Sequence, residues 1–194
     1  NYDNITKKYL IKFFDVFIAL LALLIFSPLI IFLYFLIYLD NKSPIFCQER
    51  IGKNKKKFTL IKFRTMHKGT ISRATHLIDD TQITKLGKVL RKTKLDELPQ
   101  LWNVLRGDMS LVGPRPCLPS QLELIENRSK YDLYKYLPGI TGLAQIKGIN
   151  MSDPILLSET DYRMMQNLNL RKYFYYLFST FIGSGYGDPV KQLF

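Results

Sequence analysis

Two adjacent carboxylates, Asp96 and Glu97, are the residues of this sequence whose types and setting best suit chemistry. Pro99 follows them, and proline is well tolerated in the first turn of a helix because the N–H that it lacks has no partner there. We therefore expect the pair at or next to a helix N-terminus, where free N–H groups and the helix dipole favour anions such as phosphate. Because neighbours point about 100° apart around a helix, one carboxylate can attack while the other contacts a different partner. An ordinary capping pair is the simpler interpretation.

Three basic residues are candidates for holding a phosphate beside these carboxylates. Arg115 lies in a short rigid turn, residues 113–116, with the sequence Gly-Pro-Arg-Pro. A guanidinium held in such a turn is preorganised to grip a phosphate with two hydrogen bonds. Lys62 and Arg64 stand two positions apart on a predicted strand, so their side chains share one of its faces. An exposed turn residue and a basic surface stripe are the simpler interpretations.

Residues 16–39 form an uncharged apolar run near the N-terminus. About 20 apolar residues suffice for a helix to span a bilayer, so a plain transmembrane helix is the simplest interpretation. Ser27 and Pro28 stand in the middle of the run, and proline commonly kinks a helix because it removes a backbone donor. Ser27 can return a hydrogen bond to the carbonyl groups that the proline frees.

Basic residues flank this run on both sides. They are Lys7, Lys8 and Lys12 before it and Lys42, Arg50, Lys53, Lys55, Lys56 and Lys57 after it. A helix that crosses the bilayer usually carries positive charge on its cytoplasmic side only. Positive charge at both ends favours a helix that enters the membrane, bends at Ser27 and Pro28, and returns to the same cytoplasmic side.

The rest of the chain predicts one hairpin followed by several helices. Residues 45–50 and 57–66 are expected to be its two strands, joined by a turn at 51–54. Apolar residues at helical spacing predict helices at 84–93, 95–105, 121–126, 156–168 and 170–182, and Gly107 ends the second of these. We expect loops at 68–81, 113–119 and 138–142. The aromatic residues of the last helix suit either a core or a membrane interface.

Composition narrows the function classes without deciding between them. The chain has 194 residues, with 28 basic and 16 acidic side chains, and this positive field attracts nucleic acid, lipid headgroups or nucleotides. Two scattered cysteines, Cys47 and Cys117, form neither a metal pattern nor a disulfide framework. One alternative is a non-catalytic, membrane-tethered basic protein that binds anionic lipid or nucleic acid. A membrane-bound phosphatase is a second, although its usual carboxylate-x-carboxylate motif is absent.

Six segments, in this order, resemble the bacterial sugar transferase family, the monotopic phosphoglycosyl transferases. They are residues 27–28 (Ser-Pro), 62–66 (Lys-Phe-Arg-Thr-Met), 95–100 (Leu-Asp-Glu-Leu-Pro-Gln), 107–110 (Gly-Asp-Met-Ser), 113–116 (Gly-Pro-Arg-Pro) and 138–145 (Pro-Gly-Ile-Thr-Gly-Leu-Ala-Gln). Any one of them is modest evidence, whereas six in family order over most of the chain are highly specific. The length resembles the small form of the family.

This resemblance implies a fold and a reaction. The fold is α-dominated α+β, with a re-entrant membrane helix (residues 1–42), a small β-hairpin, and amphipathic helices at the membrane interface within a catalytic domain (residues 43–194). The reaction moves a sugar 1-phosphate from a UDP-sugar to polyprenyl phosphate and releases UMP. Asp96 attacks the β-phosphate and carries a covalent phosphosugar. Glu97 helps to bind the metal or manages the proton of the lipid phosphate.

The resemblance also implies the ligands and their contacts. Magnesium is the implied cofactor, held by Asp96 and Glu97. The implied phosphate- and substrate-binding residues are Lys62, Arg64, Arg115, Thr141, Gln145 and Asp161. Ser27 and Pro28 belong to the membrane segment, and Arg91 is expected near the lipid headgroups. The expected partners are a UDP-sugar, polyprenyl phosphate and anionic or zwitterionic phospholipid, with no nucleic acid and with a homodimer left open.

The implied location is the inner membrane of a bacterium, with the protein monotopic and its catalytic domain facing the cytoplasm.

The sequence departs from the family pattern at four places, where Gln82, Leu137, Ile149 and Tyr173 stand. The family commonly has arginine at the first three of these positions and aspartate at the last. The change at Ile149 puts contacts to the nucleotide or sugar in doubt, while the two adjacent carboxylates are untouched.

Overall fold

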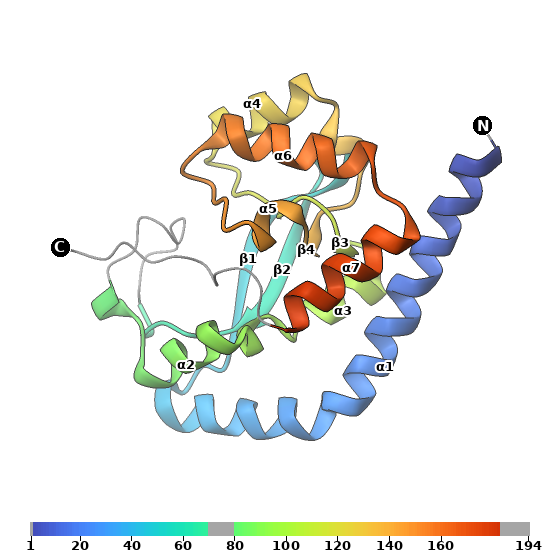
Figure 1. The fold of residues 1–194 in the computed structure, drawn as a ribbon. Helices are drawn as coiled ribbons and strands as arrows, with labels where there is room; N and C mark the ends of the chain where they lie inside the picture. The colour runs from blue at the N-terminus through green and yellow to red at the C-terminus, as the bar shows by residue number, and fades with distance from the viewer. Residues whose placement is uncertain (1, 70–79, 183–194) are drawn as a thin grey trace.

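The computed structural model describes residues 2–69 and 80–182, and within them helices predominate over two small sheets (Figure 1). The helices are α1 (Tyr2–Asn41), α2 (Lys85–Thr93), α3 (Gln100–Arg106), α4 (Leu122–Lys130), α5 (Leu143–Ile146), α6 (Pro154–Gln166) and α7 (Leu170–Phe181). The strands are β1 (Ile45–Ile51), β2 (Lys57–Phe63), β3 (Ser110–Val112) and β4 (Gly139–Thr141). The predicted α-dominated fold with a small hairpin is confirmed.

The N-terminal helix α1 is 40 residues long and contains the whole expected apolar segment. Its axis changes direction partway along its length (Figure 1), and Pro28 lies inside it. Proline bends a helix because its nitrogen donates no hydrogen bond. The Ser27 hydroxyl donates to the Leu24 carbonyl at 2.8 Å. By length and composition, Tyr9–Asn41 can cross a membrane. Its re-entrant course stays a prediction.

The two halves of α1 pack against different parts of the protein. Ala19, fully buried in the first half, belongs to the main core, together with residues of β2, α3, β3, α6 and α7. Leu33 and Ile37, in the second half, belong to a separate cluster with Phe63 of β2 and Leu90 of α2. The long helix therefore runs beneath the domain and contacts it on both sides of Pro28.

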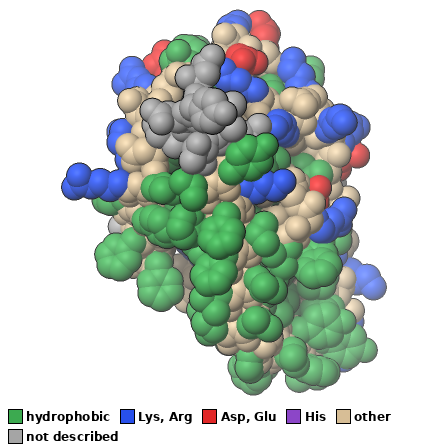
Figure 2. All heavy atoms as spheres, turned by 90° about the vertical axis from the view of Figure 1, so that its right-hand side faces the viewer, with side chains coloured by type: hydrophobic (Ala, Val, Ile, Leu, Met, Phe, Trp, Pro, Cys, Tyr) green, Lys and Arg blue, Asp and Glu red, His purple; other side chains and the backbone are tan. Residues whose placement is uncertain are grey.

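Much of the outer surface of α1 and α7 remains apolar and exposed. Figure 2 shows apolar side chains gathered over one part of the molecule, with most Lys and Arg side chains elsewhere. The exposed apolar residues of these helices include Phe13, Phe17, Leu24, Ile25, Phe32, Phe178 and Phe181. Helix α7 also buries Tyr173 and Tyr176 in the core. Its aromatic residues therefore serve the core on one face and form an exposed apolar surface on the other.

The predicted hairpin is confirmed as the antiparallel pair β1 and β2, which runs from Ile45 opposite Phe63 to Ile51 opposite Lys57. The second strand ends at Phe63, three residues earlier than expected. Met66 forms an isolated bridge with Ile83 instead. Beyond the strand, Thr65 lies against the start of α2, because the nitrogen of Thr84 donates to its carbonyl at 3.1 Å.

A second pair of strands, β3 and β4, corrects the expected loop at residues 138–142. They pair in parallel, with Ser110 opposite Gly139 and Val112 opposite Thr141. Strands of three residues are too short to show an alternating pattern in sequence. Gly139 permits the pairing, because a Cβ atom there would lie 2.0 Å from the nitrogen of Gly113.

The predicted helices need one further correction. The single helix expected at 95–105 is divided into a 3₁₀ turn, Leu95–Glu97, and α3, which ends at Gly107 with φ of 81°. Pro99 cannot donate to the carbonyl of Leu95, which accepts from the nitrogen of Leu98 instead. The other predicted helices are confirmed, although α4 continues to Lys130. Most of the loop expected at 68–81 lies outside the described residues.

Candidate functional site

The two adjacent carboxylates lie in the 3₁₀ turn that joins α2 to α3. Helix α2 ends at Lys94, whose left-handed backbone (φ of 59°) turns the chain sharply into Leu95–Glu97. Pro99 is the N-cap of α3, so the predicted placement next to a helix N-terminus is confirmed. Asp96 is buried, with 5% of its surface exposed, whereas Glu97 is only partly buried. The pair is thus split between two environments, as adjacent positions on a helical turn require.

Glu97 meets Arg115 from the rigid turn at 113–116. Their side chains form an ion pair with a 2.6 Å separation of Nη2 and Oε1, and both retain some exposure to solvent. Lys94 stands beside them, and its pKa is lowered chiefly by partial burial, with Glu97 opposing and Arg115 reinforcing the shift. The structure therefore brings Arg115 and Lys94 together at Glu97, the residue next to Asp96.

Backbone hydrogen bonds hold the turn that carries Arg115 against β4. The nitrogen of Gly139 donates to the carbonyl of Pro114, and the nitrogen of Gly113 donates to the carbonyl of Thr141, both at 2.9 Å. Two of the sequence segments singled out above, residues 113–116 and 138–145, thus form one interlocked unit. This explains why glycine is needed at 139, where any side chain would force the two backbones apart.

Two further arginines, neither of which was expected at the site, clamp the same turn; one of them, Arg50, was expected only as a basic residue flanking the apolar run. Arg128 of α4 donates to the carbonyl of Arg115 at 2.7 Å, and Arg50 of β1 donates to the carbonyl of Pro116 at 3.0 Å. Both arginines are buried. Nothing in their local sequence distinguishes them from surface basic residues, because their role depends on the tertiary approach of distant segments.

Asp161, which was predicted at the site, is fully buried and forms an ion pair with Arg128 at 2.7 Å. Burial raises the pKa of the Asp161 carboxyl, and Arg128 offsets part of that rise. Its Oδ1 atom is buried without a hydrogen-bond partner. Asp161 therefore acts on Arg115 through Arg128, and its direct contact with a substrate stays a prediction.

Lys62 and Arg64 share a face of the hairpin, as their spacing predicted. The Lys62 ammonium lies 5.8 Å and the Arg64 guanidinium 5.2 Å from the centre of the Phe46 ring. Arg64 also donates to the carbonyls of Ser43 and Ile45, at 3.0 and 3.3 Å. It thereby holds the connection between α1 and β1, whereas Lys62 lies buried on the neighbouring strand.

Three other predicted residues occupy defined positions around this unit. The hydroxyl of Thr141 forms a hydrogen bond with that of Thr180, and Gln145 donates to the carbonyl of Gly113 at 3.4 Å. Arg91 is buried, donates to the hydroxyl of Thr65 at 2.8 Å, and has a buried Nη1 atom without a hydrogen-bond partner. The contact of Arg91 with lipid headgroups stays a prediction. Ser27 and Pro28 lie exposed on α1.

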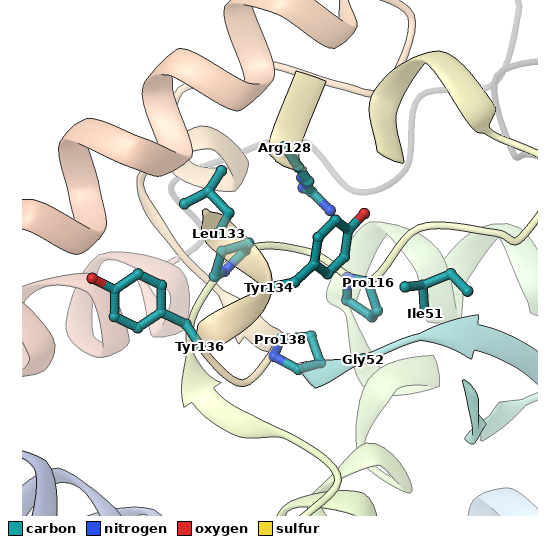
Figure 3. Close-up of a pocket in the computed structure, with 9 residues that line it drawn as sticks. Ile51, Gly52, Pro116, Arg128, Leu133, Tyr134, Tyr136 and Pro138 are labelled. Carbon is teal, nitrogen blue, oxygen red and sulfur yellow. The ribbon is translucent and has the colours of Figure 1, made fainter. Parts of the chain in front are cut away.

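A small pocket lies behind the turn at 113–116 (Figure 3). Its lining residues are Ile51, Gly52, Pro114, Pro116, Arg128, Leu133, Tyr134, Tyr136 and Pro138. Its volume is about 20 Å³, which suits a water molecule and no larger ligand. The Tyr134 hydroxyl contacts the Cys117 sulfur at 3.5 Å, and burial raises the pKa of Tyr134. The residues that line this pocket therefore support the turn at residues 113–116 and do not form a ligand site.

A divalent cation fits the donors that Asp96 and Glu97 offer. Residues 2–69 and 80–182 contain no cluster of three or more His, Cys, Asp and Glu side chains that could cage a metal. Magnesium, however, is commonly held by one or two carboxylates and takes its other ligands from water and substrate phosphates. Asp96 and Glu97 could supply the one or two carboxylate ligands of such a site, but they could not enclose the ion without water or substrate phosphates.

Residues 6–184, which are most of the chain, match the family model of the bacterial sugar transferases. The chain therefore belongs to the bacterial sugar transferase family, as the six sequence segments predicted.

Named relatives resemble the chain over about four fifths of its length. It is 38% identical over 168 residues to a UDP-galactose-lipid carrier transferase of Erwinia amylovora, covering 76% of this chain and 35% of that protein. It is 39% identical over 171 residues to an undecaprenyl-phosphate galactose phosphotransferase of Salmonella typhimurium, covering 78% of this chain and 36% of that protein. The exopolysaccharide production protein ExoY of Rhizobium meliloti is 41% identical over 175 residues, which cover 81% of this chain and 77% of ExoY. The chain thus spans about a third of the first two relatives and most of ExoY.

Proposed function

We propose that this chain transfers a sugar 1-phosphate from a UDP-sugar to polyprenyl phosphate and releases UMP, in the first membrane step of glycoconjugate synthesis. The observation that carries the proposal is the split pair of carboxylates, with Asp96 buried beside the start of α3 and Glu97 joined to Arg115. Family membership and the names of the relatives support it, because two of them act on a lipid carrier or undecaprenyl phosphate.

In this mechanism an oxygen of Asp96 attacks the β-phosphorus of the UDP-sugar. The bond from that phosphorus to the bridging oxygen breaks, UMP leaves with the electron pair, and a phosphosugar remains on Asp96. An oxygen of polyprenyl phosphate then attacks the same phosphorus and restores the free carboxylate. Carboxylates serve as covalent nucleophiles of this kind in other phosphoryl-transfer enzymes.

The surrounding residues of the chain orient and stabilise the phosphates. Arg115 can exchange its bond with Glu97 for bonds to a phosphate, since both side chains retain access to solvent. Lys62 adds positive charge from β2. Asp96 and Glu97 would hold Mg²⁺, which neutralises phosphate charge when it is bound.

We further propose that α1 enters the cytoplasmic leaflet, bends near Pro28 and returns. The bent axis in Figure 1 and the exposed apolar side chains of α1 support this course. The exposed face of α7 would rest at the interface beside it. Single cysteines placed at Lys12 and at Lys42, in a variant without native cysteines, should both react with impermeant reagents only from the cytoplasmic side. Reaction of the Lys12 position from outside the cell would instead indicate a plain spanning helix.

Replacement of the nucleophile tests the proposed reaction. Asp96→Asn should reduce UMP release from a panel of UDP-sugars, supplied with polyprenyl phosphate and Mg²⁺, to background. Glu126→Gln, an exposed carboxylate on α4, is the matched control and should retain full activity. Incubation of the native chain with the donor alone should add one phosphosugar to Asp96, as detected by mass spectrometry. Near-normal UMP release by Asp96→Asn would exclude the mechanism.

A further inference from the structure

One buried carboxylate plays no part in the proposed chemistry. Asp15 lies in the first half of α1, on the side that packs against the core, and only 4% of its surface is exposed. Its Oδ1 atom accepts a hydrogen bond from the backbone nitrogen of Leu111 at 2.9 Å and another from the hydroxyl of Tyr173 at 2.8 Å. Three segments far apart in the sequence, α1, β3 and α7, thus meet at one oxygen atom.

Packing alone does not account for a carboxylate at this place. Ile11, Phe14 and Ile18 surround Asp15 on α1 and all pack against the same core. Phe14 also makes an edge-on contact with Phe174 of α7, with ring centres 5.1 Å apart. A leucine would suit such surroundings better, because a buried charge is unfavourable unless it is hydrogen-bonded. An ionisable group in an apolar helix is therefore best explained by the partners that it binds.

The partner Leu111 connects Asp15 to the functional site. It is the middle residue of β3, which leads directly into the turn at residues 113–116 that carries Arg115. The side chain of Leu111 is buried in the same core, and β3 pairs with β4 on the other side. The position of the Leu111 backbone therefore influences where Arg115 lies relative to Glu97.

Hydrogen bonds also define the register of α1 in a way that apolar contacts do not. Sliding the helix by one turn, about 5.4 Å, would keep apolar residues against apolar residues but would separate the carboxylate from both donors. Both bonds end on one side-chain oxygen and are directional, so a small shift of the helix weakens them both. A single arrangement of helix and strand is favoured as a result.

We propose that Asp15 is a positioning residue for the transfer reaction, which fastens helix α1 to β3 and so helps to hold Arg115 beside Glu97. This inference rests on the proposed function. Asp15 acts on the reaction only through Leu111 and the turn that follows it, and not by contact with a substrate. Tyr173 supplies the second donor and restrains the same oxygen from α7.

Three variants of the full chain in lipid nanodiscs, compared with one control variant, test the proposal. Asp15→Asn keeps a carbonyl oxygen for both donors and should retain kcat/KM for the UDP-sugar within about threefold. Asp15→Leu removes the acceptor and should lower kcat/KM at least tenfold. Tyr173→Phe removes one donor, and its kcat/KM should lie between those of the two Asp15 variants. Tyr175→Phe, an exposed neighbour on α7, is the control, and its kcat/KM should match that of the native protein.

Amide hydrogen exchange over residues 109–115 gives a second readout that needs no activity. Exchange there should become faster in Asp15→Leu and stay near the native rate in Asp15→Asn. If the native chain releases no UMP, the proposed function fails, and the exchange data still decide whether Asp15 holds β3. Equal losses of activity in the Asn and Leu variants would overturn the proposal, as would native exchange in Asp15→Leu. If Asp15→Leu does not fold, native kcat/KM and native exchange in Tyr173→Phe would overturn it, and slower turnover with faster exchange would support it.

Discussion

Two arginine–carboxylate pairs meet at the turn of residues 113–116, and they differ sharply in their exposure to solvent. Arg115 and Glu97 are 2.6 Å apart with side chains 24% and 17% exposed, whereas Arg128 and Asp161 are 2.7 Å apart with side chains 3% and 0% exposed. Arg128 also donates to the carbonyl of Arg115, so the two pairs are directly linked.

The difference in burial assigns them different roles. In the buried pair, either partner alone would be an uncompensated charge in a low-dielectric interior, so the pair cannot open without a large loss of stability. The partly exposed pair is screened by water and contributes little to stability, so its partners can be exchanged. One pair therefore supports the turn, and the other remains available to bind a phosphate.

The largest expected effect comes from breaking the buried pair. Arg128→Met should lower the free energy of unfolding by about 3–5 kcal/mol, because it leaves Asp161 buried without its counter-charge. Arg115→Met, the matched change in the exposed pair, should lower it by less than about 1 kcal/mol. Denaturation in detergent micelles, followed by Trp102 fluorescence, measures both.

A double replacement is the control for this prediction. Arg128→Met combined with Asp161→Leu removes both charges and should recover most of the stability lost by Arg128→Met alone. No recovery would mean that the hydrogen bond from Arg128 to the turn, and not the ion pair, provides the stabilisation. Equal losses at Arg115 and Arg128 would remove the distinction between the two pairs.

The sequence predicts most of this fold because most of its elements depend on local signals. The apolar run, the hairpin and helices such as α2 follow from periodicity, turn residues and caps, and Thr84 caps α2 by accepting from the nitrogen of Gly87. The pair β3 and β4 could not be predicted, since three-residue strands carry no periodic signal. The division before α3 was also missed, although Pro99 was the residue that required it.

The candidate site was predictable where residues lie close in sequence and not where they meet through the fold. Asp96, Glu97 and Arg115 were identified from a helix start and a rigid turn, and the structure does bring Glu97 and Arg115 together. The partners of the turn, Arg128 and Arg50, were missed because only tertiary contacts distinguish them. Asp15 was missed for the same reason, although a carboxylate bordering an apolar run is a usable signal.

The next largest effect tests whether the exposed pair takes part in binding. Arg115→Lys keeps the charge but loses the planar two-pronged donor, so kcat/KM for the UDP-sugar should fall about a hundredfold, equivalent to about 2.7 kcal/mol. The free energy of unfolding should change by less than about 1 kcal/mol. Arg106→Lys, an exposed arginine at the end of α3, is the control and should leave both quantities unchanged. Native turnover by Arg115→Lys would assign the turn a purely structural role.

The smallest expected effect is a change of stability with pH, and it involves only the buried pair. Burial raises the pKa of Asp161 above its ordinary value of 3.8, despite the opposing effect of Arg128. The folded state therefore keeps this proton over a pH range in which the unfolded state has lost it. In this range, which begins near pH 4, the contribution of Asp161 to stability falls as pH rises, by at most about 1.4 kcal/mol per pH unit.

Comparison with Asp161→Asn isolates this contribution, because asparagine does not titrate. Between pH 4 and 7, the stability of the native chain minus that of the variant should be greatest at the acid end and should decrease as pH rises. Glu126→Gln, an exposed change on α4, is the matched control and should give a difference that varies much less. A difference that instead grows with pH would show that attraction to Arg128 outweighs burial. The buried pair would then be a net source of stability at neutral pH. The two pairs would differ in how strongly their charges attract, and not in the cost of burying charge.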